Sequence, residues 1–141
     1  MVGGIFTMMD ISSSALRAER ARMNMHANNL ANAQTTHDAD GNISPYRKKR
    51  MYFKTGNPAM TGSETLGVDV DRIEDDYRTD FVKKYEPGHP DADAEGNVLY
   101  PNVQVEIEMV DMMVAARAYE ANLAAMDAAK QMFNGALAII A

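Results

Sequence analysis

The chain has 141 residues, a formal net charge of −6 and no cysteine. This length allows one domain or two small ones. The lack of cysteine excludes disulfides, thiol catalysis and thiolate metal sites. The negative charge argues against a nucleic-acid partner, and because no run of 18 apolar residues is present we expect no membrane insertion.

Residues 5–33 have the pattern of an amphipathic helix. Four apolar side chains recur at seven-residue spacing, at Met9, Leu16, Met23 and Leu30. The segment 28–32 (NNLAN) is rich in weak helix formers, so we expect the helix to end there.

Residues 36–104 are predicted to form a loop-rich β insert. All five prolines of the chain lie in this part, between short β-like runs at 46–54, 68–73 and 79–85. In the second run Val68 and Val70 alternate with Asp69 and Asp71, which predicts a half-exposed strand. The insert has too few core residues to be very stable alone.

Residues 105–141 are predicted to form a long C-terminal helix, with Asn102 as a candidate N-cap. Its apolar residues fall into two rows with seven-residue spacing, which are the a and d positions of a helix that needs a partner. One predicted row is Met109, Ala116, Leu123, Lys130 and Leu137, and the other is Met112, Tyr119, Met126, Phe133 and Ile140. This helix would be roughly 50 Å long, and it exceeds the first helix, so pairing within the chain leaves part of the seam uncovered.

The order of elements predicts a mainly α protein with a small β insert, in which the N- and C-terminal helices form a coiled-coil pair. Residues 1–35 and 105–141 would together make the helical core domain, and residues 36–104 would make the insert. The seam alone is equally consistent with the core of a monomeric helical hairpin.

No motif predicts catalysis, a cofactor or a metal site. His26, His37 and His89 are 11 and 52 residues apart, which is neither ligand nor triad spacing. The acidic stretches 38–41 and 91–96 match only the first half of a calcium loop, because Lys49 and Asn102 stand where the final glutamate should be. The 12 methionines favour adaptable packing over copper binding.

The densest basic run is 47–50 (RKKR). It could bind nucleic acid or phospholipid, with Tyr46, Tyr52 and Phe53 as stacking groups. We favour a solvated edge strand or a contact with an acidic neighbour, such as the 69–76 stretch of an adjacent copy, because the total charge is negative.

Three stretches carry a family resemblance. NNLANAQTT at 28–36 resembles the N-terminal signature of the bacterial flagellar rod and hook proteins. YEPGHPDADAEGNVLYPNV at 85–103 and EMVDMMVAARAYEANLAAMDAAKQM at 108–132 resemble the proximal-rod members of that axial family. The motif residues that this resemblance singles out are Asn29, Asn32, Arg117, Tyr119, Glu120 and Asn122.

The resemblance implies a structural subunit of the flagellar proximal rod, whose terminal helices assemble into the axial tube that transmits torque and encloses the export channel. Implied partners are other rod proteins, neighbouring copies, basal-body components and the flagellar type III export apparatus. The implied location is the basal body, spanning the periplasm, after export without a cleaved signal peptide. The start MVGGIFTMMD is indeed a poor secretory signal. Arg117, Tyr119, Glu120 and Asn122 would make buried hydrogen bonds and ion pairs between subunits.

Two other classes of function remain. A soluble helical adaptor or chaperone would bind secreted proteins through the same seam and would be a folded helical dimer in solution, whereas a free rod subunit would show poorly protected ends by hydrogen exchange. An enzyme would need a pocket with convergent polar groups, which the sequence does not display.

Overall fold

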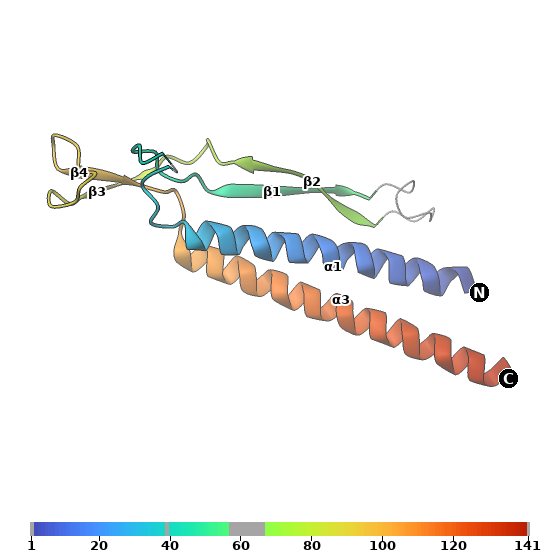
Figure 1. The fold of residues 1–141 in the computed structure, drawn as a ribbon. Helices are drawn as coiled ribbons and strands as arrows, with labels where there is room; N and C mark the ends of the chain where they lie inside the picture. The colour runs from blue at the N-terminus through green and yellow to red at the C-terminus, as the bar shows by residue number, and fades with distance from the viewer. Residues whose placement is uncertain (1, 39, 57–66, 141) are drawn as a thin grey trace. The chain divides into compact units, whose positions relative to one another are not determined.

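The computed structural model describes residues 2–38, 40–56 and 67–140, with side chains from residue 7 to residue 139 within these ranges. The predicted order of helix, β insert and helix is confirmed (Figure 1). The elements are α1 (Val2–Ala31), β1 (Lys49–Thr55), β2 (Val68–Asp75), β3 (Val82–Tyr85), β4 (Asn97–Tyr100) and α3 (Val105–Ile140). The side chain of Ile140 lies outside the described residues. Within the described ranges, no helix is long and apolar enough to cross a membrane.

The chain folds into two compact units. Unit 1 consists of Met1–Met23, Met51–Arg72 and Met113–Ala141, and unit 2 consists of Asn24–Arg50 and Ile73–Met112. Unit 2 holds seven basic and thirteen acidic residues, whereas unit 1 holds seven of each. The whole net charge of −6 therefore belongs to unit 2.

Unit 1 contains most of both helices, which run in opposite directions (Figure 1). The predicted row of α1 is half-buried at Met9, Leu16 and Met23, as it is at Leu30 in unit 2. Smaller side chains are buried more deeply, because Ala18 is 3% exposed and Ser14 is 4% exposed.

Ser14 is buried because the start of β2 meets α1 there. The Ser14 hydroxyl donates to the carbonyl of Ile11 at 2.7 Å and accepts from the backbone N–H of Val68 at 3.1 Å. A Cβ on Gly67 would lie 2.2 Å from the Ser14 oxygen. Glycine is therefore required at position 67 for this close approach.

The buried stripe of α3 matches only one of the two predicted rows. Met112, Tyr119, Met126 and Phe133 are half-buried, as predicted. The other row lies at the surface of the chain, because Met109, Leu123, Lys130 and Leu137 are exposed and only Ala116 is half-buried. Its role in contacts between subunits stays a prediction. In place of this row, α3 buries Ala115 and Ala129 completely and Asn122 partly, with Glu108 at the same seven-residue spacing.

The physical reason is the size of the side chains. The row that is buried lies one residue earlier than the predicted row, about 100° around the helix. Alanine lets two helix backbones approach closely, and interaxial distance depends on the side chains at the contact. A search for bulky apolar residues does not detect a row of alanines. Because the alanine row makes the contact between the helices, the bulky row faces outward.

The strand predictions were correct for β1, β2 and β3 and missed β4, where no β-like run was predicted. β1 and β2 form one two-stranded sheet, and β3 and β4 form another. The burial of β2 does not alternate as expected, because Val68, Asp69 and Val70 are all half-buried.

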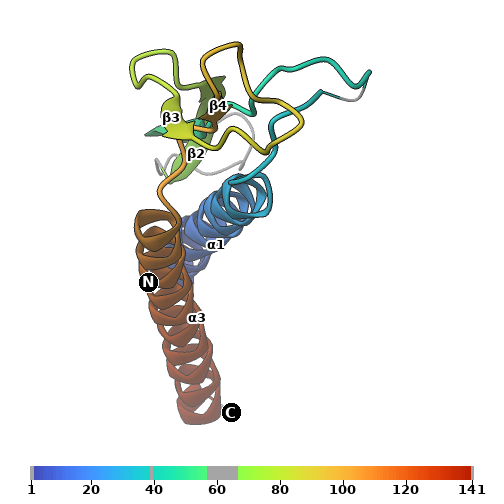
Figure 2. The same ribbon diagram turned by 90° about the vertical axis from the view of Figure 1, so that its left-hand side faces the viewer.

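The β3–β4 hairpin belongs to unit 2 (Figure 2). Its antiparallel register pairs Val82 with Tyr100 and Tyr85 with Asn97. In the connecting loop, one oxygen of the Asp93 carboxylate accepts from the backbone N–H groups of Glu95 and Asn97, at 2.9 and 2.8 Å. These bonds fix the end of the hairpin.

The same turn occurs a second time in unit 2. The Asp38 carboxylate accepts from the N–H groups of Asp40 and Asn42 at 3.0 and 2.9 Å, and Gly41 has the same φ of +80° as Gly96. Glycine adopts this left-handed conformation without steric cost. In both acidic stretches that resembled half of a calcium loop, an aspartate carboxylate thus binds the backbone of its own loop.

Candidate functional site

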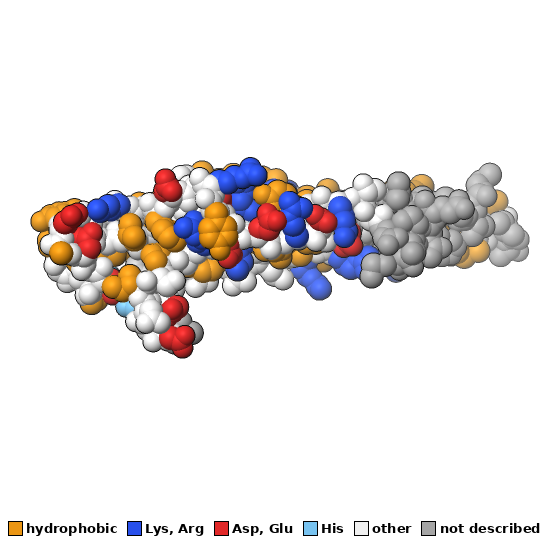
Figure 3. Space-filling model, turned by 90° about the horizontal axis from the view of Figure 1, so that it is seen from above, with side chains coloured by type: hydrophobic (Ala, Val, Ile, Leu, Met, Phe, Trp, Pro, Cys, Tyr) orange, Lys and Arg blue, Asp and Glu red, His pale blue; other side chains and the backbone are white. Residues whose placement is uncertain are grey.

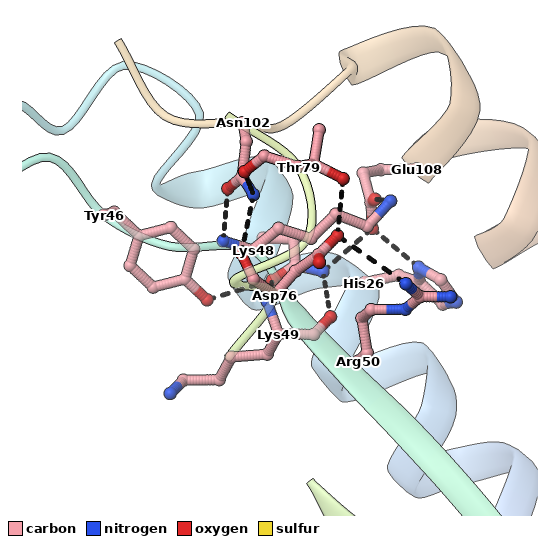
Figure 4. A network of polar contacts seen from close by, with 10 residues as sticks. His26, Tyr46, Lys48, Lys49, Arg50, Asp76, Thr79, Asn102 and Glu108 are labelled. Carbon is pink, nitrogen blue, oxygen red and sulfur yellow. Dashed lines mark hydrogen bonds and ion pairs between the residues drawn. The ribbon is translucent and has the colours of Figure 1, made fainter. Parts of the chain in front are cut away.

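A buried network of polar side chains lies in unit 2 where α1 ends and α3 begins (Figure 4). Its centre is Glu108, in the first turn of α3, which is fully buried. Lys48 Nζ lies 2.5 Å from one carboxylate oxygen. Nδ1 of His26 donates to the other oxygen at 2.7 Å, and the side-chain amide of Asn29 donates to it at 3.0 Å.

These three partners decide the charge of Glu108. Burial acts to raise the pKa of this carboxyl, because water is removed from the charged form. Hydrogen bonds from Lys48, Asn29 and His26 outweigh burial and hold the pKa below the ordinary glutamate value of 4.5. Glu108 is therefore an ionised carboxylate at neutral pH.

Asn29, from the NNLAN segment, is the second fully buried member of the network. Its amide nitrogen donates to the Lys49 carbonyl at 2.9 Å as well as to Glu108, and its oxygen accepts from the Lys49 N–H at 2.8 Å and the Tyr46 hydroxyl at 3.0 Å. A primary amide offers two donors and two acceptor sites. All are used, so α1 is joined to the start of β1.

Asn102 plays a similar role at the other end of the network. Its oxygen accepts from the Lys48 N–H at 2.8 Å, and its nitrogen donates to the carbonyls of Asp76 and Thr79 at 3.0 and 3.1 Å. The prediction that Asn102 caps α3 is wrong, since the helix begins at Val105 and the Glu108 N–H bonds to Gln104. Its buried amide instead satisfies three backbone groups far away in sequence.

Asp76, the residue directly after β2, extends the network. Its carboxylate accepts from the Thr79 hydroxyl at 2.9 Å and the Arg78 N–H at 3.0 Å, and the Arg50 guanidinium lies 3.8 Å away. Burial acts to raise the pKa of Asp76, but these bonds together lower it below the ordinary value of 3.8.

Three of the four side chains in the basic run 47–50 pair with carboxylates of the same chain. Lys48 pairs with Glu108, Lys49 pairs with Asp75 at 3.0 Å and Arg50 pairs with Asp76. Over the β1–β2 face, Lys and Arg side chains lie beside Asp and Glu side chains (Figure 3). The 69–76 stretch of the same chain thus supplies two of the partners, while the side chains of Lys49 and Arg50 stay 43% and 44% exposed, as expected for a solvated edge. A contact with another copy stays a prediction.

A second buried carboxylate, Asp91, joins two loops of unit 2. It accepts from the Thr36 hydroxyl at 2.7 Å, lies 2.8 Å from Nε2 of His37 and lies 3.7 Å from Nδ1 of His89. His26 belongs to the Glu108 network instead. Among the residues that the structure describes, no group of three or more His, Asp or Glu side chains is arranged to hold a metal ion.

The motif residues lie in different environments. Asn29 is in the network, and the Asn32 side chain donates to the Asn28 carbonyl at 2.9 Å where α1 ends. Arg117 and Glu120 pair at 2.7 Å on the surface of α3, with side chains 83% and 62% exposed. Tyr119 and Asn122 are half-buried. Their role in contacts between subunits remains a prediction.

Sequence reasoning missed most of the network. Glu108 and His26 were assigned to no site, and Lys48 was assigned to a solvated run. The available signal was the seven-residue spacing from Glu108 to Ala115, Asn122 and Ala129. A carboxylate in a buried row needs a cation, because an unpaired buried charge is costly.

Known proteins resemble both ends of the chain and its middle. A family model described as "Flagella basal body rod protein" matches residues 9–36, and one described as "Flagellar basal body rod FlgEFG protein C-terminal" matches residues 94–139. The flagellar basal-body rod protein FlgC of Borreliella burgdorferi is 39% identical over 97% of this chain and 98% of its own length. FlgC of Bacillus subtilis is 41% identical over 95% and 97%, and FlgC of Escherichia coli O157:H7 is 41% identical over 91% and 92%. The chain belongs to the FlgC family of flagellar basal-body rod proteins.

Proposed function

We propose that this chain is a structural subunit of the bacterial flagellar proximal rod. Its terminal helices would assemble with those of neighbouring subunits into the axial tube that transmits torque and encloses the export channel. The likeness to FlgC proteins over nearly the whole chain supports this function. Neighbouring copies, other rod proteins and basal-body components would be its partners, and the flagellar type III export apparatus would deliver it.

One structural observation identifies residues of α3 that would contact neighbouring subunits. α3 leaves a row of bulky apolar side chains exposed, in which Leu123 is 44% exposed. Met109 and Leu137 are exposed in the same row, and further exposed apolar side chains lie on other faces of the helix, namely Val110, Met113, Val114 and Met132. Exposed apolar surface of this extent marks a contact with another molecule. In the rod, neighbouring helices would cover this surface.

The proposal is tested by Leu123→Asp, which places a charge in the exposed row. Because Leu123 is not part of the buried stripe, the variant should fold with wild-type stability. We expect it to be exported, to be absent from purified basal bodies and to abolish swimming in soft agar. The measurements are immunoblots of basal-body fractions and of exported protein.

A matched control is Gln131→Asp, which introduces the same charge at an exposed and already polar position of α3. This variant should enter the basal body and support swimming. Normal incorporation of Leu123→Asp would sink the proposal that this row is the assembly surface.

The adaptor or chaperone alternative is disfavoured by the likeness to rod proteins. Hydrogen exchange on the free chain discriminates the two. A rod subunit should exchange rapidly in the amides of α3 beyond Leu123, whereas a folded helical dimer should protect them.

A further inference from the structure

Two methionine side chains of α3 are strongly exposed, both in unit 1. Met113 is 60% exposed and Met132 is 54% exposed, which is more than any other methionine side chain that the structure describes. Met25, which lies on α1 in unit 2, is only 8% exposed. The chain thus carries methionine sulfurs in two environments, and Met25 serves as an internal reference for the accessibility of the other two.

Exposed methionine sulfur has a defined reaction with hydrogen peroxide. A lone pair of the sulfur attacks one peroxide oxygen, the O–O bond breaks, and the departing hydroxide takes up the proton of the transferred oxygen and leaves as water. The thioether is oxidised by two electrons to a sulfoxide, and the peroxide is reduced to water. The chain contains no cysteine, so no thiol of its own competes for the oxidant.

Met132 lies on an exposed apolar face of α3. Val114 is 18 residues earlier and Ile139 is 7 residues later, so the three side chains project from nearly the same side of the helix. Val114 is 51% exposed and Ile139 is 87% exposed. Met113 lies about 100° around the helix from Val114, between this face and the row that contains Leu123.

Oxidation makes this apolar surface polar. A sulfoxide carries an oxygen that accepts hydrogen bonds, on a side chain that was apolar before. Covering that oxygen with apolar side chains removes it from water without supplying a donor, which is unfavourable. At Met113 and Met132 the oxygen stays solvated in the free chain. Oxidation there should therefore leave the fold intact and oppose contact with another chain.

We propose that Met113 and Met132 are modification sites through which hydrogen peroxide controls assembly, because their sulfoxides prevent the chain from joining the rod. Methionine sulfoxide reductases reverse this modification, so repair returns an oxidised chain to the state that assembles. The inference rests on the proposed function, because it requires that neighbouring helices cover α3.

The first experiment measures the order of oxidation in the free full-length chain. The chain is treated with hydrogen peroxide, and mass spectrometry follows the sulfoxide at each methionine with time. Met113 and Met132 should oxidise several-fold faster than Met25, while circular dichroism stays that of the untreated chain. Equal rates at Met25 and at the two exposed positions would overturn the assignment of the sites.

The second experiment follows the same modification in cells that are forming new rods. After exposure to hydrogen peroxide, mass spectrometry compares the chain in purified basal bodies with the unassembled chain. The sulfoxide fraction at Met113 and Met132 should be about tenfold lower in basal bodies, as expected for covering one polar group without a partner. The double variant Met113→Leu with Met132→Leu should keep its level of incorporation under peroxide, because leucine contains no sulfur.

Met113→Gln tests the same step without an oxidant. Glutamine has a length similar to that of methionine and places a polar group near the position of the sulfoxide oxygen. The variant should fold like the wild-type chain and should be depleted from basal bodies. Met113→Leu is the matched control, because it keeps the position apolar and should be incorporated normally.

Two outcomes in the cell would overturn the inference. They are equal sulfoxide fractions in basal bodies and in the unassembled chain, and normal incorporation of Met113→Gln. In both cases the chain would still be present in the basal bodies. Absence of the untreated wild-type chain from basal bodies would instead contradict the proposed function.

Discussion

The two units hold the same pair of helices by different chemistry. In unit 2, α1 and α3 are joined through Glu108, whose charge is satisfied by Lys48, His26 and Asn29. In unit 1, the buried positions of the helices include Ala18, Ala115 and Ala129, while the bulky apolar row of α3 is exposed. Polar bonds need defined partners and are complete within one chain. Under the proposed function, other chains would cover the exposed row.

The largest expected effect comes from removing the cation of the network. Lys48→Met leaves the fully buried Glu108 carboxylate without its ion-pair partner, and breaking such a pair costs about 3–5 kcal/mol. Urea unfolding of the free chain should show this loss. Lys54→Met is the matched control, because Lys54 lies 3.8 Å from Asp71 in an exposed pair and its loss should cost less than about 1 kcal/mol. Equal losses of unfolding free energy in Lys48→Met and Lys54→Met would contradict the difference between the two units.

A smaller effect is expected from overfilling the seam of unit 1. Ala115 is fully buried, so Ala115→Leu forces side chains into a space sized for a methyl group and should cost about 1–3 kcal/mol. The exposed Ala124 provides the control, since Ala124→Leu should change the free energy of unfolding by less than about 0.5 kcal/mol. Wild-type stability of Ala115→Leu would show that unit 1 does not use a close helix contact.

The smallest effect is expected from protonation, which removes charge but leaves every side chain in place. The pKa of Glu108 is lowered by folding, so its contribution is fully present above the ordinary glutamate value and is lost as pH falls through the folded value. Asp76 acts in the same direction. Urea unfolding at pH 7, 5, 4 and 3 should show this loss, and Glu108→Gln should have a shallower pH dependence. Identical pH profiles would contradict an ionised Glu108.

The helix boundaries could be read from the sequence because they depend on local signals. Weak helix formers at NNLAN predicted an end that agrees with Ala31. The apolar spacing predicted a second helix from residue 105, and α3 begins at Val105. Strand β4 was missed because Asn97 belongs both to a turn and to the hairpin register with Tyr85. That register is a contact between residues distant from each other, and local propensity does not specify it.

The sequence by itself determined the class of the fold, the half-buried row Met112, Tyr119, Met126 and Phe133, and the resemblance to rod proteins. These follow from periodicity and motif spacing, which are properties of the chain alone. Only the tertiary structure decided that alanines rather than Met109, Leu123 and Leu137 complete the seam. It also decided that the basic run 47–50 is matched inside the chain. The physical reason is that close packing and charge pairing depend on which groups meet in space, and side-chain size or charge along the sequence does not specify the partner.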